Sequence, residues 1–295
     1  MLQVGIVGLP NAGKSTLFNA LVKKQQALVA SYPFATIEPN VGIVPVPDER
    51  LEKLAEIYHA PIIPATVRFV DIAGLVKGAS QGEGLGNKFL AHIREVDLIC
   101  EVVRAFDGSR DFLNDMEIIK TELELADLDT VSKLMAKKFI YVLNTNLDTD
   151  WEEVKKIQEK YPGEVCVLDA KLEADLGEFS PAERADYLYS LGIKKAGVDE
   201  LIKLAYERLG LISFLTAGEK EVRAWTIKNG TKALEAAGVI HTDFMKGFIK
   251  AEAVDCADFI QYNGWKSCRQ LGKTKLCGRD YEIKDGEVIE FRVNT

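Results

Sequence analysis

The sequence has no apolar run near the roughly 20 residues that a membrane-spanning helix needs, which argues against a membrane protein. It has no Cys-x-x-Cys pair and an odd number of cysteines, five, so neither a disulfide framework nor a zinc site is indicated. No basic stretch followed by an apolar one opens the chain, so we expect no secretory signal. Together these features favour a reducing, cytoplasmic compartment.

The chain also lacks an excess of positive charge. Its 37 Lys and Arg against 45 Asp and Glu give a net charge of −8 over 295 residues. This balance excludes a globally basic nucleic-acid-binding protein. Residues 213–295 are close to neutral, however, with 13 basic and 12 acidic residues, so a locally basic face there stays open.

The length predicts two domains, and the texture of the sequence changes near residue 212. In residues 1–212, short apolar runs alternate with amphipathic stretches, which predicts an α/β domain with a mainly parallel sheet flanked by helices. Residues 213–295 predict a small α+β domain with strands at 223–228, 246–252, 281–284 and 288–293. Asp285-Gly286 predicts a hairpin turn between the last two strands.

A phosphate-binding pattern lies near the start of the chain. Residues 8–15, Gly-Leu-Pro-Asn-Ala-Gly-Lys-Ser, match G-x-x-x-x-G-K-[ST] between an apolar strand and a helix. Backbone amides of such a loop and the helix N-terminus can surround a phosphate. We expect Lys14 to reach the β- and γ-phosphates and the Ser15 hydroxyl to bind Mg²⁺. The pattern predicts a P-loop nucleotide hydrolase.

Two further segments fit magnesium-dependent hydrolysis. Asp71 ends an apolar strand and begins the pattern Asp-Ile-Ala-Gly, so its carboxylate would hold the water shell of Mg²⁺. The Gly74 amide would then contact the γ-phosphate. Thr36 lies in a proline-flanked loop, where a threonine is expected to close onto the metal.

Leu75 follows Gly74 at the position where many GTPases place a water-positioning glutamine. An apolar side chain cannot orient water, so hydrolysis should be slow or should recruit another group. Asn11, inside the phosphate loop, suggests such a group, because its amide oxygen could help to coordinate a monovalent cation such as K⁺.

The base-recognition segment departs from the guanine pattern. Asn144 follows an apolar strand where GTPases carry N-K-x-D, whose aspartate recognises guanine, but the fourth position here is Leu147. Without that carboxylate, the selectivity for guanine should be lost and ATP should be preferred. Asp148 lies one residue later and leaves guanine recognition open as an alternative.

The residues around these motifs resemble the YchF family of Obg-like ATPases. The resemblance is carried by residues 5–16, 32–40, 71–79, 82–90 and 214–226 and covers nearly the whole chain. It implies a P-loop ATPase that prefers ATP to GTP and binds the ribosome or its large subunit. It also implies that residues 213–295 form a β-grasp module of the TGS type.

Carried over to this sequence, the resemblance implies a set of site residues. Phosphate binding falls to Asn11, Ala12, Gly13, Lys14, Ser15 and Thr16. Mg²⁺ falls to Ser15 and Thr36, and base contacts fall to Asn144 and the Thr145 backbone. Leu75 matches the family's apolar replacement of the catalytic glutamine.

The sequence departs from the family in two places. The family's base motif usually reads N-x-x-E, and Leu147 stands at the glutamate position. The family's long helical hairpin is missing or shortened near residues 129–138, either because this form of the protein lacks it or because its residues are left out of these 295.

Two alternatives to the ATPase hypothesis stay open. One is a GTPase of the ribosome-assembly type. The other is a ribosome- or RNA-binding adaptor in which hydrolysis is incidental. In each case we expect contact with ribosomal RNA through basic residues of the C-terminal domain. These are Lys246, Lys250, Lys266, Arg269, Lys273 and Lys275.

Overall fold

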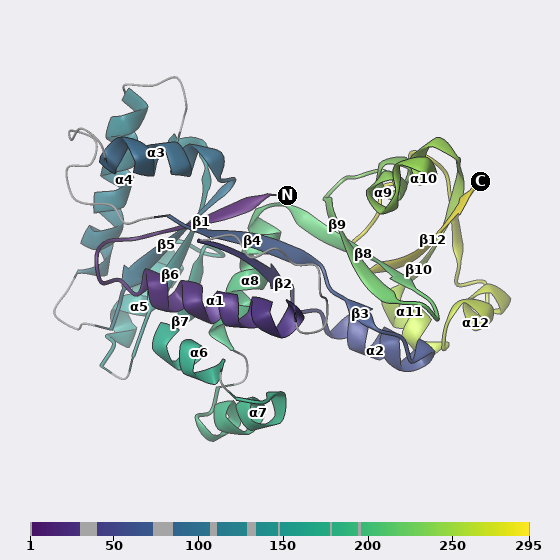
Figure 1. Cartoon of the computed structure of the whole chain (residues 1–295), viewed down its shortest axis with the longest axis horizontal. Helices are drawn as coiled ribbons and strands as arrows, with labels where there is room; N and C mark the ends of the chain where they lie inside the picture. The colour runs from purple at the N-terminus through teal and green to yellow at the C-terminus, as the bar shows by residue number, and fades with distance from the viewer. Residues whose placement is uncertain are drawn as a thin grey trace. The chain divides into compact units, whose positions relative to one another are not determined.

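The computed structural model describes residues 2–29, 40–72, 85–106, 111–128, 134–146, 148–177, 179–193 and 196–294. The chain forms two compact units (Figure 1): Met1–Pro45 with Val67–Leu209, and Val46–Thr66 with Gly210–Thr295. No helix in these described ranges is long and apolar enough to cross a membrane.

The N-terminal unit is built on a six-stranded sheet in the order β2-β4-β1-β5-β6-β7. β1 pairs in parallel with β4 and β5, and β6 pairs in parallel with β5 and β7. All residues of β5 but the last are buried, as expected for a parallel strand covered on both faces. The strands are Gln3–Val7 (β1), Val41–Pro45 (β2), Thr66–Asp71 (β4), Leu98–Arg104 (β5), Lys138–Asn144 (β6) and Val165–Leu168 (β7).

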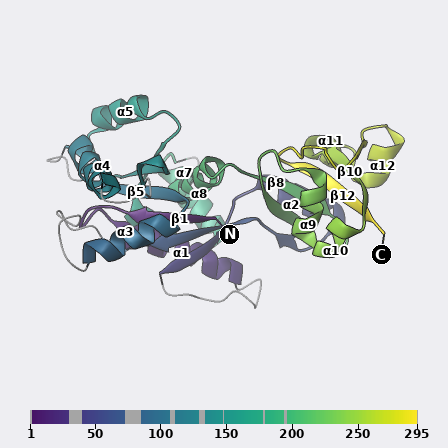
Figure 2. The ribbon, with the colours of Figure 1, turned by 90° about the horizontal axis from the view of Figure 1, so that it is seen from above.

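Helices cover both faces of this sheet, so the predicted α/β architecture is confirmed. α3 and α4 pack around Val7 and Ile99, and α4 and α5 pack around Tyr141 and Leu143. Figure 2 shows α4 and α5 on one side of β1 and β5, with α1 on the other. The helices are Lys14–Val29 (α1), Leu85–Glu95 (α3), Phe112–Leu128 (α4), Trp151–Lys160 (α5), Ala170–Leu176 (α6), Pro181–Ser190 (α7) and Gly197–Arg208 (α8), with a 3₁₀ turn at Leu134–Ala136.

The C-terminal unit has a mixed sheet in the order β11-β10-β12-β8-β9-β3. β12 is parallel to β8 and antiparallel to β10, and β8 is antiparallel to β9. Residues of α9 share an apolar core with these strands. The elements are Glu49–Tyr58 (α2), Ile62–Ile63 (β3), Leu211–Ala217 (β8), Val222–Lys228 (β9), Ala233–Ile240 (α9), Thr242–Lys246 (α10), Phe248–Asp255 (β10), Cys256–Gln261 (α11), Trp265–Gln270 (α12), Lys275–Cys277 (β11) and Glu287–Val293 (β12).

The structure differs from the predicted division into residues 1–212 and 213–295, because residues 46–66 belong to the C-terminal unit. β3 pairs in parallel with β9 and adds an edge strand to its sheet. The backbone N–H of Val222 donates to the Pro61 carbonyl at 2.9 Å. Leu51 and Leu54 of α2 are buried, and Arg50 forms an ion pair with Asp285 at 2.8 Å. Pairing between distant segments therefore sets the boundary of this unit.

The predicted hairpin of residues 281–284 and 288–293 is wrong in its first strand. Residues 281–284 make only an isolated bridge, from Glu282 to Lys232, while β12 pairs with β10 and β8. The Asp285-Gly286 turn is present, and Gly286 has a positive φ of 79°. Both turn residues bind the backbone of Ser213 in β8. The Gly286 N–H donates to the Ser213 carbonyl at 2.8 Å, and the Asp285 carboxylate accepts from the Ser213 N–H at 2.9 Å. The turn thus attaches to a neighbouring strand instead of closing a hairpin.

Candidate functional site

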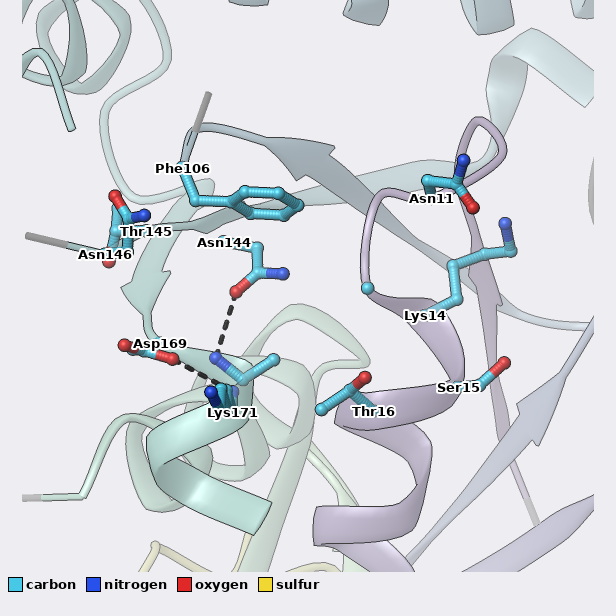
Figure 3. Close-up of a pocket in the computed structure, with 12 residues that line it drawn as sticks. Asn11, Lys14, Ser15, Thr16, Phe106, Asn144, Thr145, Asn146, Asp169 and Lys171 are labelled. Atoms are coloured by element: carbon cyan, nitrogen blue, oxygen red, sulfur yellow. Dashed lines mark hydrogen bonds between the residues drawn. The ribbon is translucent and has the colours of Figure 1, made fainter. Parts of the chain in front are cut away.

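A cavity of about 510 Å³ lies at the carboxyl ends of β1, β5, β6 and β7 in the N-terminal unit. Ligands of open α/β sheets bind at this edge, where successive loops converge. Figure 3 shows the residues around the cavity. We call Asn11, Gly13, Lys14, Ser15 and Thr16 its phosphate end, and Phe106, Asn144, Thr145, Asn146, Asp169, Ala170 and Lys171 its base end.

The loop between β1 and α1 has the backbone that its glycines predict. Gly13 has a φ of 97°, and a Cβ at this position would lie 2.2 Å from Nδ2 of Asn144. Gly13 therefore tolerates no side chain, on grounds of both conformation and space. Asn11 also has a positive φ, 63°, in the left-handed region that asparagine adopts more readily than most residues. The exposed Asn11 side chain and Lys14 both line the phosphate end of the cavity (Figure 3).

Lys14, the first residue of α1, is held over the loop. Its ammonium donates to the carbonyls of Gly8 at 2.8 Å and Leu9 at 3.0 Å. Burial lowers the pKa of Lys14, and the nearby Asp71 carboxylate partly opposes that shift. Ser15 and Thr16 follow in the first turn of α1, where free backbone amides and the helix dipole favour an anion. This end of the cavity is therefore suited to phosphate.

The donor set at the end of β4 fits a magnesium ion. Burial raises the pKa of Asp71, and the neighbouring Lys14 cation partly opposes that shift. A partly buried carboxylate of this kind gains from a further cation, and the exposed Ser15 hydroxyl at the start of α1 could supply a second oxygen ligand. Within the described residues, no three His, Cys, Asp or Glu side chains form a metal-binding cluster. Mg²⁺ needs no such cluster, because in nucleotide sites it retains waters and binds substrate phosphates.

Asn144 joins the two ends of the cavity and is only 5% exposed. Its Nδ2 donates to the Ala12 carbonyl of the phosphate loop at 2.9 Å, and its Oδ1 accepts from the Ala170 N–H at 2.9 Å. The predicted base-contact residue thus first fixes the loop before α1 against the start of α6. Thr145 is also buried and bonds to the Leu168 carbonyl through its N–H, at 2.8 Å, and through its hydroxyl, at 3.2 Å.

The base end contains three residues that the sequence interpretation did not assign to the site. Phe106 follows β5, Asn146 follows β6, and Asp169 follows β7 and begins α6. Their common signal is position, because each comes just after a parallel strand whose neighbours carry predicted site residues. From the sequence, Ala170-Lys171 is expected to form a base-backing loop because it comes just after an apolar strand, and both residues line the cavity.

Four residues named in the predictions lie outside the described residues. They are Thr36, Gly74, Leu75 and Leu147. The described geometry therefore brings together the predicted phosphate-loop residues, Asp71, Asn144 and Thr145.

This arrangement of a glycine-dependent loop, its lysine and a helix N-terminus at one sheet edge defines a P-loop nucleotide-binding protein. Residues 3–145 match a family described as "50S ribosome-binding GTPase". Residues 211–294 match the C-terminal family of YchF GTPases, described as "Protein of unknown function (DUF933)".

Full-length relatives give the particular family. The chain is 43% identical to the "Ribosome-binding ATPase YchF" of Bacillus subtilis, covering 99% of each chain. It is 41% identical to the protein of the same name from Escherichia coli O157:H7, again over 99% of each chain. The solved "Structure of the Schizosaccharomyces pombe YchF GTPase" matches with a TM-score of 0.84 and 33% identity, over 99% of this chain and 97% of that one. The chain belongs to the YchF family.

The alignment with the Bacillus subtilis protein runs over 364 positions, although this sequence has 295 residues. At least 69 positions of that alignment therefore have no counterpart in this sequence. The missing positions are consistent with the expectation that the helical hairpin is absent or shortened in this sequence.

Proposed function

We propose that this protein is a ribosome-associated, Mg²⁺-dependent ATPase that acts in the cytoplasm and releases ADP and phosphate. The observation that carries the proposal is the cavity at the strand ends, which is lined by Lys14 and the start of α1, with the Asp71 carboxylate near Lys14. Relatives over 40% identical along the full chain are named ribosome-binding ATPases, which supports the same reading.

The residues divide the work of hydrolysis between them. The backbone of residues 11–16 and the Lys14 ammonium would hold the β- and γ-phosphates and offset their charge. Ser15, Thr36 and, through water, Asp71 would hold Mg²⁺, which neutralises charge that develops on the phosphates. We further propose that the Gly74 amide contacts the γ-phosphate.

We propose that the protein hydrolyses slowly and uses K⁺ as an activator. Leu75 cannot orient the attacking water, so a glutamine-type mechanism is not available to it. The exposed Asn11 side chain lines the phosphate end together with Lys14 (Figure 3). A K⁺ ion that Asn11 helps to bind there would stabilise charge between the β- and γ-phosphates.

We propose that ATP is preferred to GTP. In the guanine-specific motif, a carboxylate accepts from the guanine N1–H and 2-amino groups, and Leu147 stands at that position here. GTP would leave those donors unpaired, at about 1–3 kcal/mol each. One such penalty corresponds to roughly a tenfold weaker affinity. Asn144 Oδ1 and the Thr145 backbone are the proposed contacts for the base.

We propose that the C-terminal unit is a TGS-type module that contacts ribosomal RNA of the large subunit. Ion pairs reduce the number of basic side chains that are available to contact RNA. Lys246 pairs with Asp243 at 3.4 Å, and Lys273 pairs with Asp258 at 3.3 Å. Arg269 pairs with Glu252 and Glu290. The Lys275 ammonium lies 4.2 Å from the centre of the Tyr281 ring. The basic side chains best placed to attract phosphates are therefore Lys250 and Lys266.

Titration of the full chain with ATP and with GTP tests the proposal most directly. ATP should bind about tenfold more tightly in the presence of Mg²⁺. Tighter binding of GTP would favour the GTPase of the ribosome-assembly type. A turnover assay with and without ribosomes separates both enzymes from an adaptor, for which hydrolysis would be negligible in either condition.

A further inference from the structure

We propose that Asp169 is a specificity-determining residue. One of its carboxylate oxygens accepts a hydrogen bond from the 6-amino group of adenine and disfavours the 6-carbonyl oxygen of guanine. This inference rests on the nucleotide-hydrolase function proposed above. It concerns a residue at the base end of the same cavity, between β7 and α6.

The base end has already used many of its fixed hydrogen-bond donors. Four backbone N–H groups of its lining donate inside the protein, at distances of 2.8 or 2.9 Å. A guanine carbonyl could not bind any of them without displacing an existing partner. The pairs are Thr145 N to Leu168 O, Asn146 N to Thr149 Oγ1, Ala170 N to Asn144 Oδ1, and Lys171 N to Asp169 Oδ1.

The oxygens at the base end, by contrast, keep unused capacity. Asp169 caps α6 with Oδ1 alone, which accepts from Lys171 N at 2.9 Å and Leu172 N at 3.0 Å. Its second carboxylate oxygen accepts no hydrogen bond from the described part of the chain. Asn144 Oδ1 accepts one hydrogen bond, from Ala170, and an amide oxygen has room for a second. Apart from the Asn146 amide nitrogen, whose partner oxygen accepts from Asp148 N at 2.9 Å, the fixed side-chain groups that remain available here are therefore acceptors.

Such a surface suits adenine better than guanine. At position 6, adenine carries an amino group with two donor hydrogens, whereas guanine carries an acceptor. An ionised carboxylate can only accept, so guanine O6 next to Asp169 would place two acceptors against each other. The Lys171 ammonium is a donor on a flexible four-carbon stem and can approach either base. Of the two fixed acceptors at this end, Asn144 Oδ1 is neutral and Asp169 carries a charge, so we assign most of the discrimination at position 6 to Asp169.

The test uses Asp169→Asn in the full chain, with affinities measured calorimetrically for three ligands. These are ATP, GTP and purine riboside triphosphate, which carries hydrogen at position 6. The variant keeps the oxygen that caps α6 and replaces the free oxygen with an amino group. We expect the affinity for ATP to fall about tenfold, the affinity for purine riboside triphosphate to stay unchanged, and the affinity for GTP to stay unchanged or rise.

Asp150→Asn is the matched control. Asp150 caps α5 in the same way, accepting from Glu152 N at 3.0 Å and Glu153 N at 3.3 Å, but does not line the cavity. It should change none of the three affinities.

Two results with Asp169→Asn would overturn the inference. An equal loss for all three ligands would mean that Asp169 only caps α6. A loss confined to GTP would mean that the carboxylate binds guanine N1–H. The ATP-to-GTP ratio of the unsubstituted protein tests the proposed ATP preference separately, so either idea can fail without the other.

Discussion

Asn144→Ala should loosen the cavity and weaken nucleotide binding together. The Asn144 side chain is the described link between the phosphate loop and α6, through Ala12 and Ala170, and it is nearly fully buried. Truncation would leave a carbonyl and an N–H without their partners, at about 1–3 kcal/mol each. If the two penalties add, we therefore expect a loss of about 2–6 kcal/mol in the free energy that holds these two segments together.

The conservative change Asn144→Asp should not rescue the link. It keeps an acceptor for Ala170 N, but it places an oxygen where Nδ2 now lies 2.9 Å from the Ala12 carbonyl. Asn114→Ala is the matched control, because Asn114 is an exposed asparagine of α4 in the same unit.

Hydrogen exchange measured by mass spectrometry is the appropriate assay. Exchange should accelerate at the starts of α1 and α6 in Asn144→Ala, while amides of the C-terminal unit serve as an internal reference. Nucleotide affinity should fall in the same variant. Unchanged exchange at both helix starts, together with unchanged affinity, would refute the reasoning that this side chain couples the two ends of the cavity.

Three further predictions follow from the site and the surface. Lys14→Ala should abolish hydrolysis and weaken nucleotide binding, because Lys14 is the cation of the phosphate end. A phosphate-release assay and a titration with ATP test these two effects. Hydrolysis should be faster in K⁺ than in Na⁺ at matched ionic strength if Asn11 helps to bind the activating cation, and equal rates would remove that mechanism. Lys250→Glu with Lys266→Glu should reduce ribosome co-sedimentation in a salt-dependent way, and Lys156→Glu on α5 should not.

Features that depend on neighbouring residues could be predicted from the sequence. The short apolar run at residues 3–7 predicts a strand and the amphipathic stretch at 85–95 predicts a helix, and β1 and α3 have these bounds. The phosphate loop is likewise found where its pattern predicts it. Asp150 directly precedes an amphipathic stretch, which predicts a helix start, and its side chain accepts from the first-turn amides of α5.

The base end was harder to predict because distant segments form it. Asn144 and Ala12, which share a hydrogen bond, are 132 residues apart. In the sequence, Asp169 has only the features of a helix N-cap. Its second carboxylate oxygen can contact a base only because β7 pairs with β6, which brings Asp169 to the base end of the cavity. The sequence therefore shows which residue types follow each strand, but which of them line the cavity depends on the order of the strands in the sheet.

Pairing between distant segments also explains why the boundary between the two units could not be predicted from the sequence. It further determines how ribosome binding should be tested. Residues 46–66 connect β2 to β4, both strands of the N-terminal sheet, yet β3 within that segment pairs with β9 of the other unit. A fragment ending at Leu211 would keep α2 and β3 while removing the strand that β3 pairs with. Loss of ribosome binding by that fragment could then reflect exposure of this apolar surface, so point substitutions in the full chain give the clearer answer.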